Sequence, residues 1–356
     1  MTSPQKPPSI LRLKDREIGP DRPVFIIAEA GVNHNGDLQM ARRLVDAAID
    51  AGADAVKFQA FKAEDVVSVG AAKAEYQVAT SGGGESQLDM VRKLELSGAA
   101  FRELQAYCTE RGILFLATPF DFGSADLLAE MNVPLFKISS GEVTNLPFLE
   151  YVARKGKPLI VSTGMCFLGE VDEAVRLLQG ADCEDLVLLH CTSNYPTRPE
   201  DVNLRAMQTL GAAFGFPVGY SDHTIGIAVA QAAVALGACV IEKHFTLDRT
   251  LPGPDHQASL EPDELTAMVR GIRVVEAALG DPIKRRVASE DAVARVARRS
   301  LVASRDLPAG TVLTRDLIAI KRPGSGLKPE LLSHLVGRKL RVAVAYDQLF
   351  ELGFLE

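Results

Sequence analysis

The residues of this sequence with the most evident chemical potential are polar side chains that directly follow short apolar runs. His223 and His244 follow the last two of these runs, and Glu29 follows the first. Two histidines near oxygen donors such as water, a substrate or Asp255 suit a borderline to hard divalent ion, Mn²⁺ or Mg²⁺, rather than structural zinc. The alternative is a pair of hydrogen-bonded loop histidines. Glu29 could act as an acid or a base, or could pair with Lys57.

Lysines and hydroxyl-bearing side chains stand at the corresponding positions of the other runs. The lysines are Lys57 and Lys137, and the hydroxyl groups belong to Thr118, Ser140, Ser162, Ser193 and Ser221. Such a set of cations and hydroxyl donors suits a small, multiply anionic ligand whose carboxylate or phosphate accepts charge-assisted hydrogen bonds. Each residue taken singly could also be an ordinary loop residue. Their recurrence after every run, while several runs begin with proline or glycine, favours one shared site.

The elements that must position these residues are eight short apolar runs that alternate with longer amphipathic stretches. Short apolar runs with β-branched residues predict buried parallel strands. We expect the strands at 24–28, 53–58, 113–117, 135–138, 159–162, 186–190, 218–220 and 239–242. Between the runs, apolar residues recur with helical spacing. Eight strand–helix units predict a (β/α)₈ barrel, in which the chemistry lies at the carboxyl ends of the strands.

An open, doubly wound sheet is the alternative arrangement for this pattern. That fold expects a glycine-rich phosphate fingerprint after the first strand. Residues 31–36 read GVNHNG, which is not a GxGxxG motif, so the barrel is favoured. Residues 59–112 include a long insertion with a polar stretch at 73–87. This insertion is either an active-site lid or specificity element, or a solvated loop.

Composition and charge exclude several classes of protein. Apolar residues make up 47% of the 356 residues, which is typical of a packed chain rather than a disordered one. The formal net charge of −7 argues against a basic nucleic-acid-binding protein. We find no apolar run long enough to span a bilayer and no secretory core at the N-terminus. Five scattered cysteines without a CxxC pair suit a reducing cytoplasm.

The chain is expected to divide into a tail, a barrel, a linker and a small C-terminal domain. Residues 1–20 predict a tail, and the barrel is expected over 21–280. Residues 281–299 are charged and predict a linker helix. Residues 300–356 show short strands and turns, which predict a small mixed domain with a meagre core. Such a domain would gain stability by docking elsewhere.

Ten motifs, in order, resemble those of the sialic acid synthase family, which includes N-acetylneuraminate, legionaminate and pseudaminate synthases. The motifs are IIAEAGVNHNGD (26–37), VKFQAFKA (56–63), ATPFD (117–121), FKISSGE (136–142), VSTGM (161–165), LLHCTSNYP (188–196), GYSDHT (219–224), EKHFTLD (242–248), GPDHQAS (253–259) and KRPGSG (321–326). The C-terminal segment resembles the antifreeze-like (SAF) domain. The motifs look slightly closer to the legionaminate branch, and pseudaminate synthesis is the least expected.

The resemblance implies a condensation in which C3 of phosphoenolpyruvate adds to the aldehyde of an open-chain N-acetylated hexosamine. Water attacks C2, and phosphate leaves by C–O cleavage. The acceptor would be N-acetylmannosamine or 2,4-diacetamido-2,4,6-trideoxymannose. His223 and His244 are implied to hold a metal, typically Mn²⁺ with Mg²⁺ or Co²⁺ as alternatives, that polarises the aldehyde oxygen. Glu29 would handle a proton or position water, and the implied phosphoenolpyruvate ligands are Lys57, Thr118, Lys137, Ser140, Ser162, Ser193 and Ser221.

The implied sugar site consists of Gln59, Tyr195, Asp255 and Arg322. In the family, the SAF domain crosses a homodimer and caps the partner's barrel, with the arginine on the N-acetyl group. Two other functions stay open. One is a 3-deoxy-sugar-acid synthase that uses phosphorylated aldoses, which would not need that arginine. The other is a non-catalytic sugar-phosphate-binding barrel, which the presence of Glu29, Lys57 and both histidines disfavours.

Overall fold

The computed structural model describes residues 10–13, 16–74, 77–78 and 84–356. The start of the predicted tail and part of the predicted polar insertion therefore lie outside the described residues. The chain forms two compact units that divide between Gly280 and Asp281. None of the described helices is long and apolar enough to cross a membrane.

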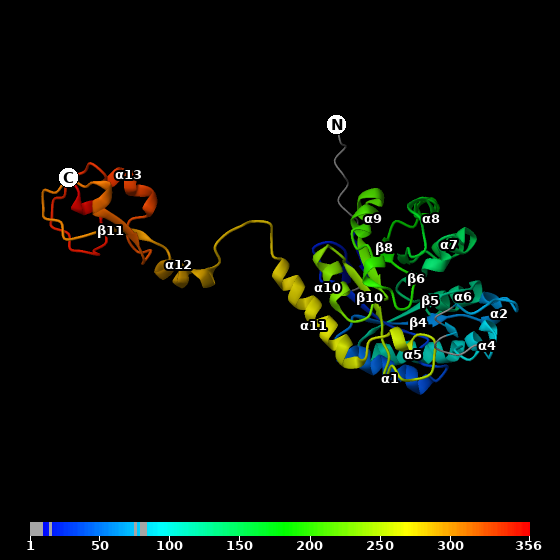
Figure 1. Ribbon diagram of the computed structural model, residues 1–356. Coiled ribbons are helices and arrows are strands. Elements are labelled where there is room, and N and C mark those ends of the chain that lie inside the picture. The colour runs from blue at the N-terminus through cyan, green and yellow to red at the C-terminus, as the bar shows by residue number, and fades with distance from the viewer. Residues whose placement is uncertain (1–9, 14–15, 75–76, 79–83) are drawn as a thin grey trace. The chain divides into compact units, whose positions relative to one another are not determined.

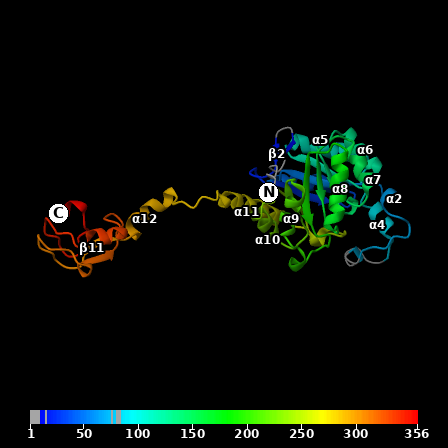
Figure 2. The ribbon, with the colours of Figure 1, turned by 90° about the horizontal axis from the view of Figure 1, so that it is seen from above.

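The first unit is a barrel of parallel strands with helices outside it (Figures 1 and 2). Within the described residues, eight parallel strands pair in the order β5-β4-β3-β10-β9-β8-β7-β6, and β5 contacts β6, so the sheet nearly closes. The predicted barrel is confirmed, and each strand lies close to its predicted position. The strands are β3 (Phe25–Gly31), β4 (Ala55–Ala60), β5 (Leu114–Pro119), β6 (Phe136–Ile138), β7 (Leu159–Ser162), β8 (Leu186–Cys191), β9 (Val218–Asp222) and β10 (Val240–His244).

Amphipathic helices bury one face against the outside of the strands. In the first of them, Asp37 caps the N-terminus by accepting hydrogen bonds from two backbone N–H groups, and Leu44 and Val45 are fully buried. The helices are α1 (Leu38–Asp50), α5 (Gly98–Arg111), α6 (Phe122–Glu130), α7 (Leu146–Ala153), α8 (Leu168–Gly180), α9 (Ala206–Phe214), α10 (Ala228–Ala235) and α11 (Pro262–Leu279).

A short antiparallel hairpin of β1 (Leu11–Leu13) and β2 (Arg16–Ile18) precedes the barrel. Leu11 and Ile18 are buried and pack in the same apolar cluster as the interior residues of the strands. The prediction of a tail over residues 1–20 is therefore wrong for this part. The physical reason is that two apolar side chains at the ends of a short polar segment can cover the open end of the barrel interior.

The described part of the insertion after β4 includes the short helices α2 (Ala63–Val66) and α4 (Gln87–Arg92). Because it leaves the carboxyl end of β4, it lies at the mouth of the barrel where the strand-end residues meet. A small apolar cluster, separate from the main core, forms here from Val32, Phe61 and Leu94, with Val91 and Phe120 packed against it.

The second unit is a small β-rich domain. Its short helix α12 (Asp291–Ala297) covers only part of the linker helix that we predicted over 281–299. Gly280, at φ 58°, ends α11, and Pro282 has no backbone N–H with which to continue it. The antiparallel strands β11 (Ser300–Ala303) and β12 (Ile318–Lys321) pair over a core that includes Leu301 and Phe350, and α13 (Leu332–Leu335) follows.

Candidate active site

The carboxyl ends of the barrel strands bring the predicted polar residues into one cavity of about 480 Å³, a size typical of small-molecule sites. Along β3, Phe25 and Ile27 face the interior core, so Glu29, two residues further on, faces inward as well. The predicted residues that line the cavity are Glu29, Lys57, Gln59, Thr118, Lys137, Ser140, Ser162, Ser193, Tyr195, Ser221, His223, His244 and Asp255. Arg322 belongs to the second unit, where it is exposed directly after β12.

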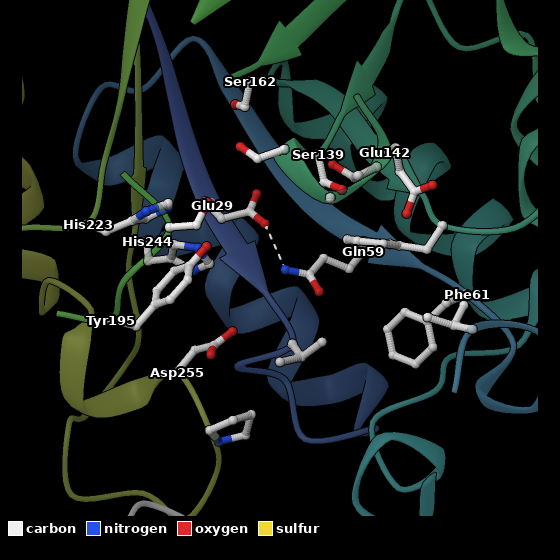
Figure 3. Close-up of a pocket in the computed structure, with 18 of the residues that line it drawn as sticks. Glu29, Gln59, Phe61, Ser139, Glu142, Ser162, Tyr195, His223, His244 and Asp255 are labelled. Atoms are coloured by element: carbon white, nitrogen blue, oxygen red, sulfur yellow. Dashed lines mark hydrogen bonds between the residues drawn. The ribbon is translucent and has the colours of Figure 1, made fainter. Parts of the chain in front are cut away.

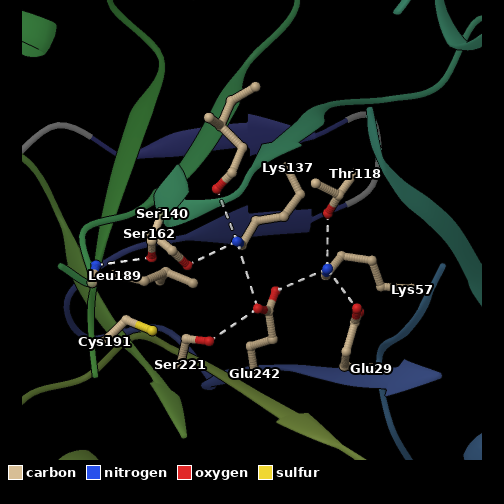
Figure 4. A network of polar contacts seen from close by, with 12 residues as sticks. Glu29, Lys57, Thr118, Lys137, Ser140, Ser162, Leu189, Cys191, Ser221 and Glu242 are labelled. Carbon is tan, nitrogen blue, oxygen red and sulfur yellow. Dashed lines mark hydrogen bonds and ion pairs between the residues drawn. The ribbon is translucent and has the colours of Figure 1, made fainter. Parts of the chain in front are cut away.

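Glu242 joins the two lysines of the cavity into one network (Figure 4). Its Oε2 lies 3.7 Å from Lys57 Nζ, and its Oε1 lies 3.5 Å from Lys137 Nζ. Ser221 Oγ donates a hydrogen bond to Oε1 at 3.0 Å. Burial by itself would raise the pKa of Glu242, but Lys137 and Lys57 lower it to about 2, so the carboxylate stays ionised. Our sequence interpretation gave this residue no role. The signal was present, because strand alternation turns Glu242 inward whenever His244 faces inward.

Each lysine is also held by a hydroxyl group. Lys57 Nζ donates to Thr118 Oγ1 at 2.9 Å and pairs with Glu29 Oε2 at 2.7 Å. Lys137 Nζ donates to Ser162 Oγ at 2.7 Å. A hydroxyl oxygen that accepts from an ammonium group can turn its own hydrogen toward an anion in the cavity. Thr118 and Ser162 can therefore donate to a carboxylate or phosphate next to the two lysines.

Two further hydroxyl groups converge on Gly164. The Gly164 N–H donates to Ser140 Oγ at 2.8 Å, which leaves the hydroxyl hydrogen of Ser140 able to reach an anion. A Cβ at this position would lie 2.3 Å from Ser193 Oγ and 2.9 Å from Ser140 Oγ. Glycine is thus required for the close approach of the two hydroxyl groups. Cys191, which sequence reasoning did not single out, lines the same part of the cavity.

Glu29 is a buried carboxyl group that can exchange a proton near neutral pH. Burial raises its pKa to about 7, with Lys57 opposing the shift and Glu242 reinforcing it. Gln59 Nε2 donates to Glu29 Oε1 at 3.4 Å (Figure 3). A carboxyl group with such a pKa can both give and take a proton under working conditions. The ion pair between Glu29 and Lys57, which was the alternative to an acid–base role, is present. It partly offsets the rise in the pKa of Glu29 that burial causes.

His223 and His244 lie together on one wall of the cavity, with Tyr195 and Asp255 beside them (Figure 3). The centroids of the two imidazole rings are 5.5 Å apart, and the Tyr195 ring lies 4.1 Å from that of His223. The carbonyl oxygen of Thr192 is 2.8 Å from His223 Nδ1. Because a carbonyl oxygen can only accept, Nδ1 carries a hydrogen toward Thr192, and Nε2 is the ring nitrogen left for another partner.

His244 meets the requirements of a metal ligand. Its Nδ1 is buried and makes no hydrogen bond to the described part of the chain. Burial lowers the pKa of His244 well below its ordinary value, so the ring is neutral. In the described ranges, no group of three or more His, Cys, Asp or Glu residues is arranged to hold a metal. A cation here would therefore depend on the two histidines and on oxygen atoms from water or substrate.

Lys243, which alternates with these inward residues, forms a buried ion pair behind the cavity. Its Nζ lies 2.8 Å from Asp222 Oδ2, and the two side chains are 1% and 0% exposed. We expect Lys243→Met to lower the free energy of unfolding by about 3–5 kcal/mol, because Asp222 is left buried and unpaired. Urea unfolding measures this loss. The double variant Lys243→Met/Asp222→Asn should recover part of the lost stability. If Lys243→Met is as stable as the wild type, the ion pair with Asp222 does not stabilise the fold.

Fold and site together define a class: a (β/α)₈ barrel whose mouth holds a cavity lined by buried lysines and hydroxyl groups, followed by a small β-rich domain. The model of the NeuB family matches residues 44–284, and that of the SAF domain matches residues 298–352. The chain belongs to the NeuB family, as the sequence motifs predicted.

Named relatives and a solved structure match most of the chain. The N,N'-diacetyllegionaminic acid synthase of Campylobacter jejuni is 50% identical over 88% of this chain and 95% of its own length. The human N-acetylneuraminate-9-phosphate synthase is 42% identical over 93% of this chain and 92% of its own. Among solved structures, the N-acetylneuraminic acid synthetase from Leptospira borgpetersenii, crystallised in complex with citrate, matches with a TM-score of 0.72. The match covers 80% of this chain and 95% of that chain, and the two sequences are 38% identical.

Proposed function

We propose that this protein is a nonulosonic acid synthase that condenses phosphoenolpyruvate with an open-chain N-acetylated hexosamine and releases phosphate. The observation that carries the proposal is the buried network in which Lys57, Lys137 and their hydroxyl partners face one cavity beside a carboxyl group, Glu29, whose pKa is about 7. The names of the relatives support it. The 50% identical legionaminic acid synthase makes 2,4-diacetamido-2,4,6-trideoxymannose the first acceptor to test, with N-acetylmannosamine second.

In the proposed reaction, the two lysines and the hydroxyl groups of Thr118, Ser140 and Ser162 bind the carboxylate and phosphate of phosphoenolpyruvate. The π electrons of the C2–C3 double bond of phosphoenolpyruvate form a bond from C3 to the aldehyde carbon of the sugar, while the C=O π bond opens and the aldehyde oxygen takes up a proton to become a hydroxyl group. The oxygen of water adds to C2, and the bond from C2 to the bridging oxygen breaks, so that this oxygen leaves with phosphate. Glu29 accepts or returns the proton of the attacking water.

We propose further that His223 and His244 hold a divalent cation, with Mn²⁺ expected first and Mg²⁺ or Co²⁺ as alternatives. The unpaired Nδ1 of His244 and the hydrogen bond that fixes His223 support this assignment. The bound cation would polarise the aldehyde oxygen of the acceptor as a Lewis acid. Burial raises the pKa of Asp255 to about 6, and on this wall it can accept a hydrogen bond from a sugar hydroxyl, as Tyr195 and Gln59 also can.

The active form that we propose is a homodimer in which the SAF domain of each chain caps the partner's barrel and places Arg322 on the N-acetyl group of the sugar. Two observations support it: the SAF unit is compact by itself, and Arg322 is exposed at the end of β12. We also propose a cytoplasmic location, because all five cysteines are unpaired, which suits a reducing compartment.

Replacing either lysine of the network by methionine tests the anion site. Lys57→Met or Lys137→Met removes one charge-assisted contact, worth roughly 1.5–3 kcal/mol. The KM for phosphoenolpyruvate should therefore rise about ten- to a hundredfold in steady-state kinetics. Lys339→Met, at a half-exposed position in the second unit, is the control and should leave this KM unchanged. An unchanged KM in both network variants would place the lysines outside the phosphoenolpyruvate site.

The activity itself is tested by phosphate release from phosphoenolpyruvate in the presence of Mn²⁺ and each acceptor, with the sugar acid measured in parallel. Release that requires an N-acetylated acceptor and matches the sugar acid in amount is the expected result. Release only with a phosphorylated aldose would instead indicate a 3-deoxy-sugar-acid synthase. Binding of phosphoenolpyruvate without turnover on any acceptor would indicate a non-catalytic barrel.

A further inference from the structure

Four buried polar side chains lie behind the wall of the cavity that His223 and His244 form (Figure 3). We call these four residues the histidine frame, and they are Thr197, Asp222, Thr224 and Lys243. The described residues that line the cavity include none of the four. Buried polar side chains are held by hydrogen bonds, and those of the histidine frame reach the segments that carry the two histidines.

The first part of the histidine frame joins the two strands that lead to the histidines. Asp222 and Lys243 are register partners on β9 and β10. His223 and His244 are the residues that directly follow them. Lys243 Nζ donates to Asp222 Oδ2 at 2.8 Å and to the carbonyl oxygen of Thr224 at 2.6 Å. The ion pair therefore fixes the two strand ends relative to each other at the point where the imidazole groups leave the backbone.

Asp222 also fixes the turn that carries His223. Its Oδ1 accepts hydrogen bonds from the N–H of Thr224 at 2.9 Å and from the hydroxyl group of Thr224 at 2.7 Å. An aspartate that accepts from the backbone two residues later closes a turn around the residue between them. His223 is that residue, so the buried carboxylate holds its backbone in place.

Thr197 holds His223 at two further points. The Thr197 N–H donates to the carbonyl oxygen of His223 at 2.8 Å. The Thr197 hydroxyl group lies 2.7 Å from the carbonyl oxygen of Asn194 and 3.1 Å from that of Thr192. The same Thr192 oxygen accepts from the imidazole Nδ1 of His223. One threonine thus contacts both the backbone of His223 and the carbonyl group that orients its ring.

The alternative is that the histidine frame only stabilises the barrel. A buried ion pair often stabilises a fold no better than apolar residues of the same volume, so stability by itself does not explain one at this place. The contacts of the frame are also concentrated on one short segment. Residues 222–224 receive the hydrogen bonds of Lys243 and of the Thr197 N–H, in addition to those between Asp222 and Thr224. Such a concentration is typical of residues that orient a neighbouring side chain.

We propose that the four residues of the histidine frame are positioning residues, which hold the imidazole groups of His223 and His244 in the arrangement that binds a divalent cation. The inference rests on the proposed cation site. A cation held by two imidazole groups has few other protein ligands to retain it when one ring is displaced. Loss of a hydrogen-bonding group behind a metal ligand typically lowers metal affinity about 10–100-fold. The histidine frame should therefore act on metal affinity, and on turnover only through it.

The test measures the Kd for Mn²⁺ of the full-length, metal-free protein by titration calorimetry, and the stability of the same samples by urea unfolding. Thr224→Val and Thr197→Val each remove one hydroxyl group from the histidine frame and keep the branched shape of the side chain. Thr224→Ser and Thr197→Ser keep the hydroxyl group. Ser124→Ala is the matched control, because the buried Ser124 hydroxyl group also donates to a carboxylate, Asp121 Oδ2 at 2.7 Å, but does not line the cavity.

We expect each valine variant to raise the Kd for Mn²⁺ about 10–100-fold, whereas the serine variants and Ser124→Ala should bind as the wild type does. At saturating Mn²⁺ the turnover of the valine variants should return close to that of the wild type, because the groups that line the cavity are unchanged. If the wild type binds Mn²⁺ and both valine variants bind it equally tightly, the histidine frame serves only the fold and the proposal is overturned. An equal rise of the Kd in Ser124→Ala would overturn it as well, because the effect would then be a general loss of stability.

A measurement on the wild type keeps the proposal testable if the valine variants do not fold. In ¹⁵N NMR spectra of the metal-free protein, which has six histidines, His223 should carry a hydrogen on Nδ1. A His223 ring without this hydrogen would contradict its orientation by Thr192, and with it the role of Thr197. No binding of Mn²⁺ by a wild type that shows this hydrogen would instead contradict the cation site itself, and the positioning role would fall with it.

Discussion

His223→Ala is expected to lower turnover by at least about a thousandfold, because a Lewis-acid metal contributes several kcal/mol to the stabilisation of the transition state. The cavity offers the proposed cation two imidazole groups, and the described residues supply no third protein ligand in a suitable arrangement. Removal of one imidazole leaves little to retain the ion. Elemental analysis of the purified variant should therefore find less bound metal, and phosphate release should fall in parallel.

The control for this variant is His334→Ala, at an exposed position in the second unit, which should keep both metal and activity. Exhaustive chelation of the wild type should abolish turnover, and added Mn²⁺ should restore it. If the chelated protein keeps full activity, the metal proposal is wrong, and the two histidines act only through hydrogen bonds such as that between His223 and Thr192.

The second large effect concerns the shared site of the proposed dimer. Arg322→Ala and Glu29→Gln should each be nearly inactive, the first through loss of the N-acetyl contact and the second through loss of the acid–base group. After random subunit exchange, about half of the dimers are mixed, and one of the two sites in each mixed dimer carries both native residues. The mixture should therefore regain about a quarter of wild-type activity, measured as phosphate release.

A conservative variant and a control for subunit exchange accompany the mixing experiment. Arg322→Lys should not restore activity fully, because lysine cannot reproduce the planar fork of donors that arginine presents to a carbonyl group. Subunit exchange itself must be demonstrated with differently tagged chains. No recovery of activity in a mixture that has exchanged would mean that Arg322 does not complete the partner's barrel, and the crossed dimer would be wrong.

Most of the barrel and the cavity could be predicted from the sequence, because both depend on local patterns. Buried parallel strands are short continuous apolar runs, and their carboxyl ends must converge, so Lys57, Lys137 and Ser162 were expected to meet. Their contacts bear this out: Lys137 donates to Ser162, and Glu242 links Lys137 to Lys57. The match to the NeuB family model also agrees with the family that the ten ordered motifs resemble.

Other features depend on contacts that no local pattern encodes. The small apolar cluster at the barrel mouth joins Phe61 and Phe120, which follow two different strands, with Leu94 from the insertion, and each looks like an ordinary loop residue in the sequence. The hairpin that carries Leu11 and Ile18 is too short for its alternation to stand out. The place of Glu242 in the cavity could have been predicted from the sequence. If His244 faces inward, Glu242, two residues earlier on the same strand, must face inward as well.

One isotope measurement tests most directly whether this cavity catalyses condensation with cleavage of the C–O bond of phosphoenolpyruvate. The reaction is run in H₂¹⁸O with phosphoenolpyruvate, Mn²⁺ and 2,4-diacetamido-2,4,6-trideoxymannose, and the released phosphate is analysed by mass spectrometry. We expect phosphate without ¹⁸O, in amounts equal to the sugar acid formed, because the oxygen of water goes to C2. Phosphate that carries one ¹⁸O atom, released without the sugar acid, would show simple hydrolysis at phosphorus and would contradict the proposed condensation.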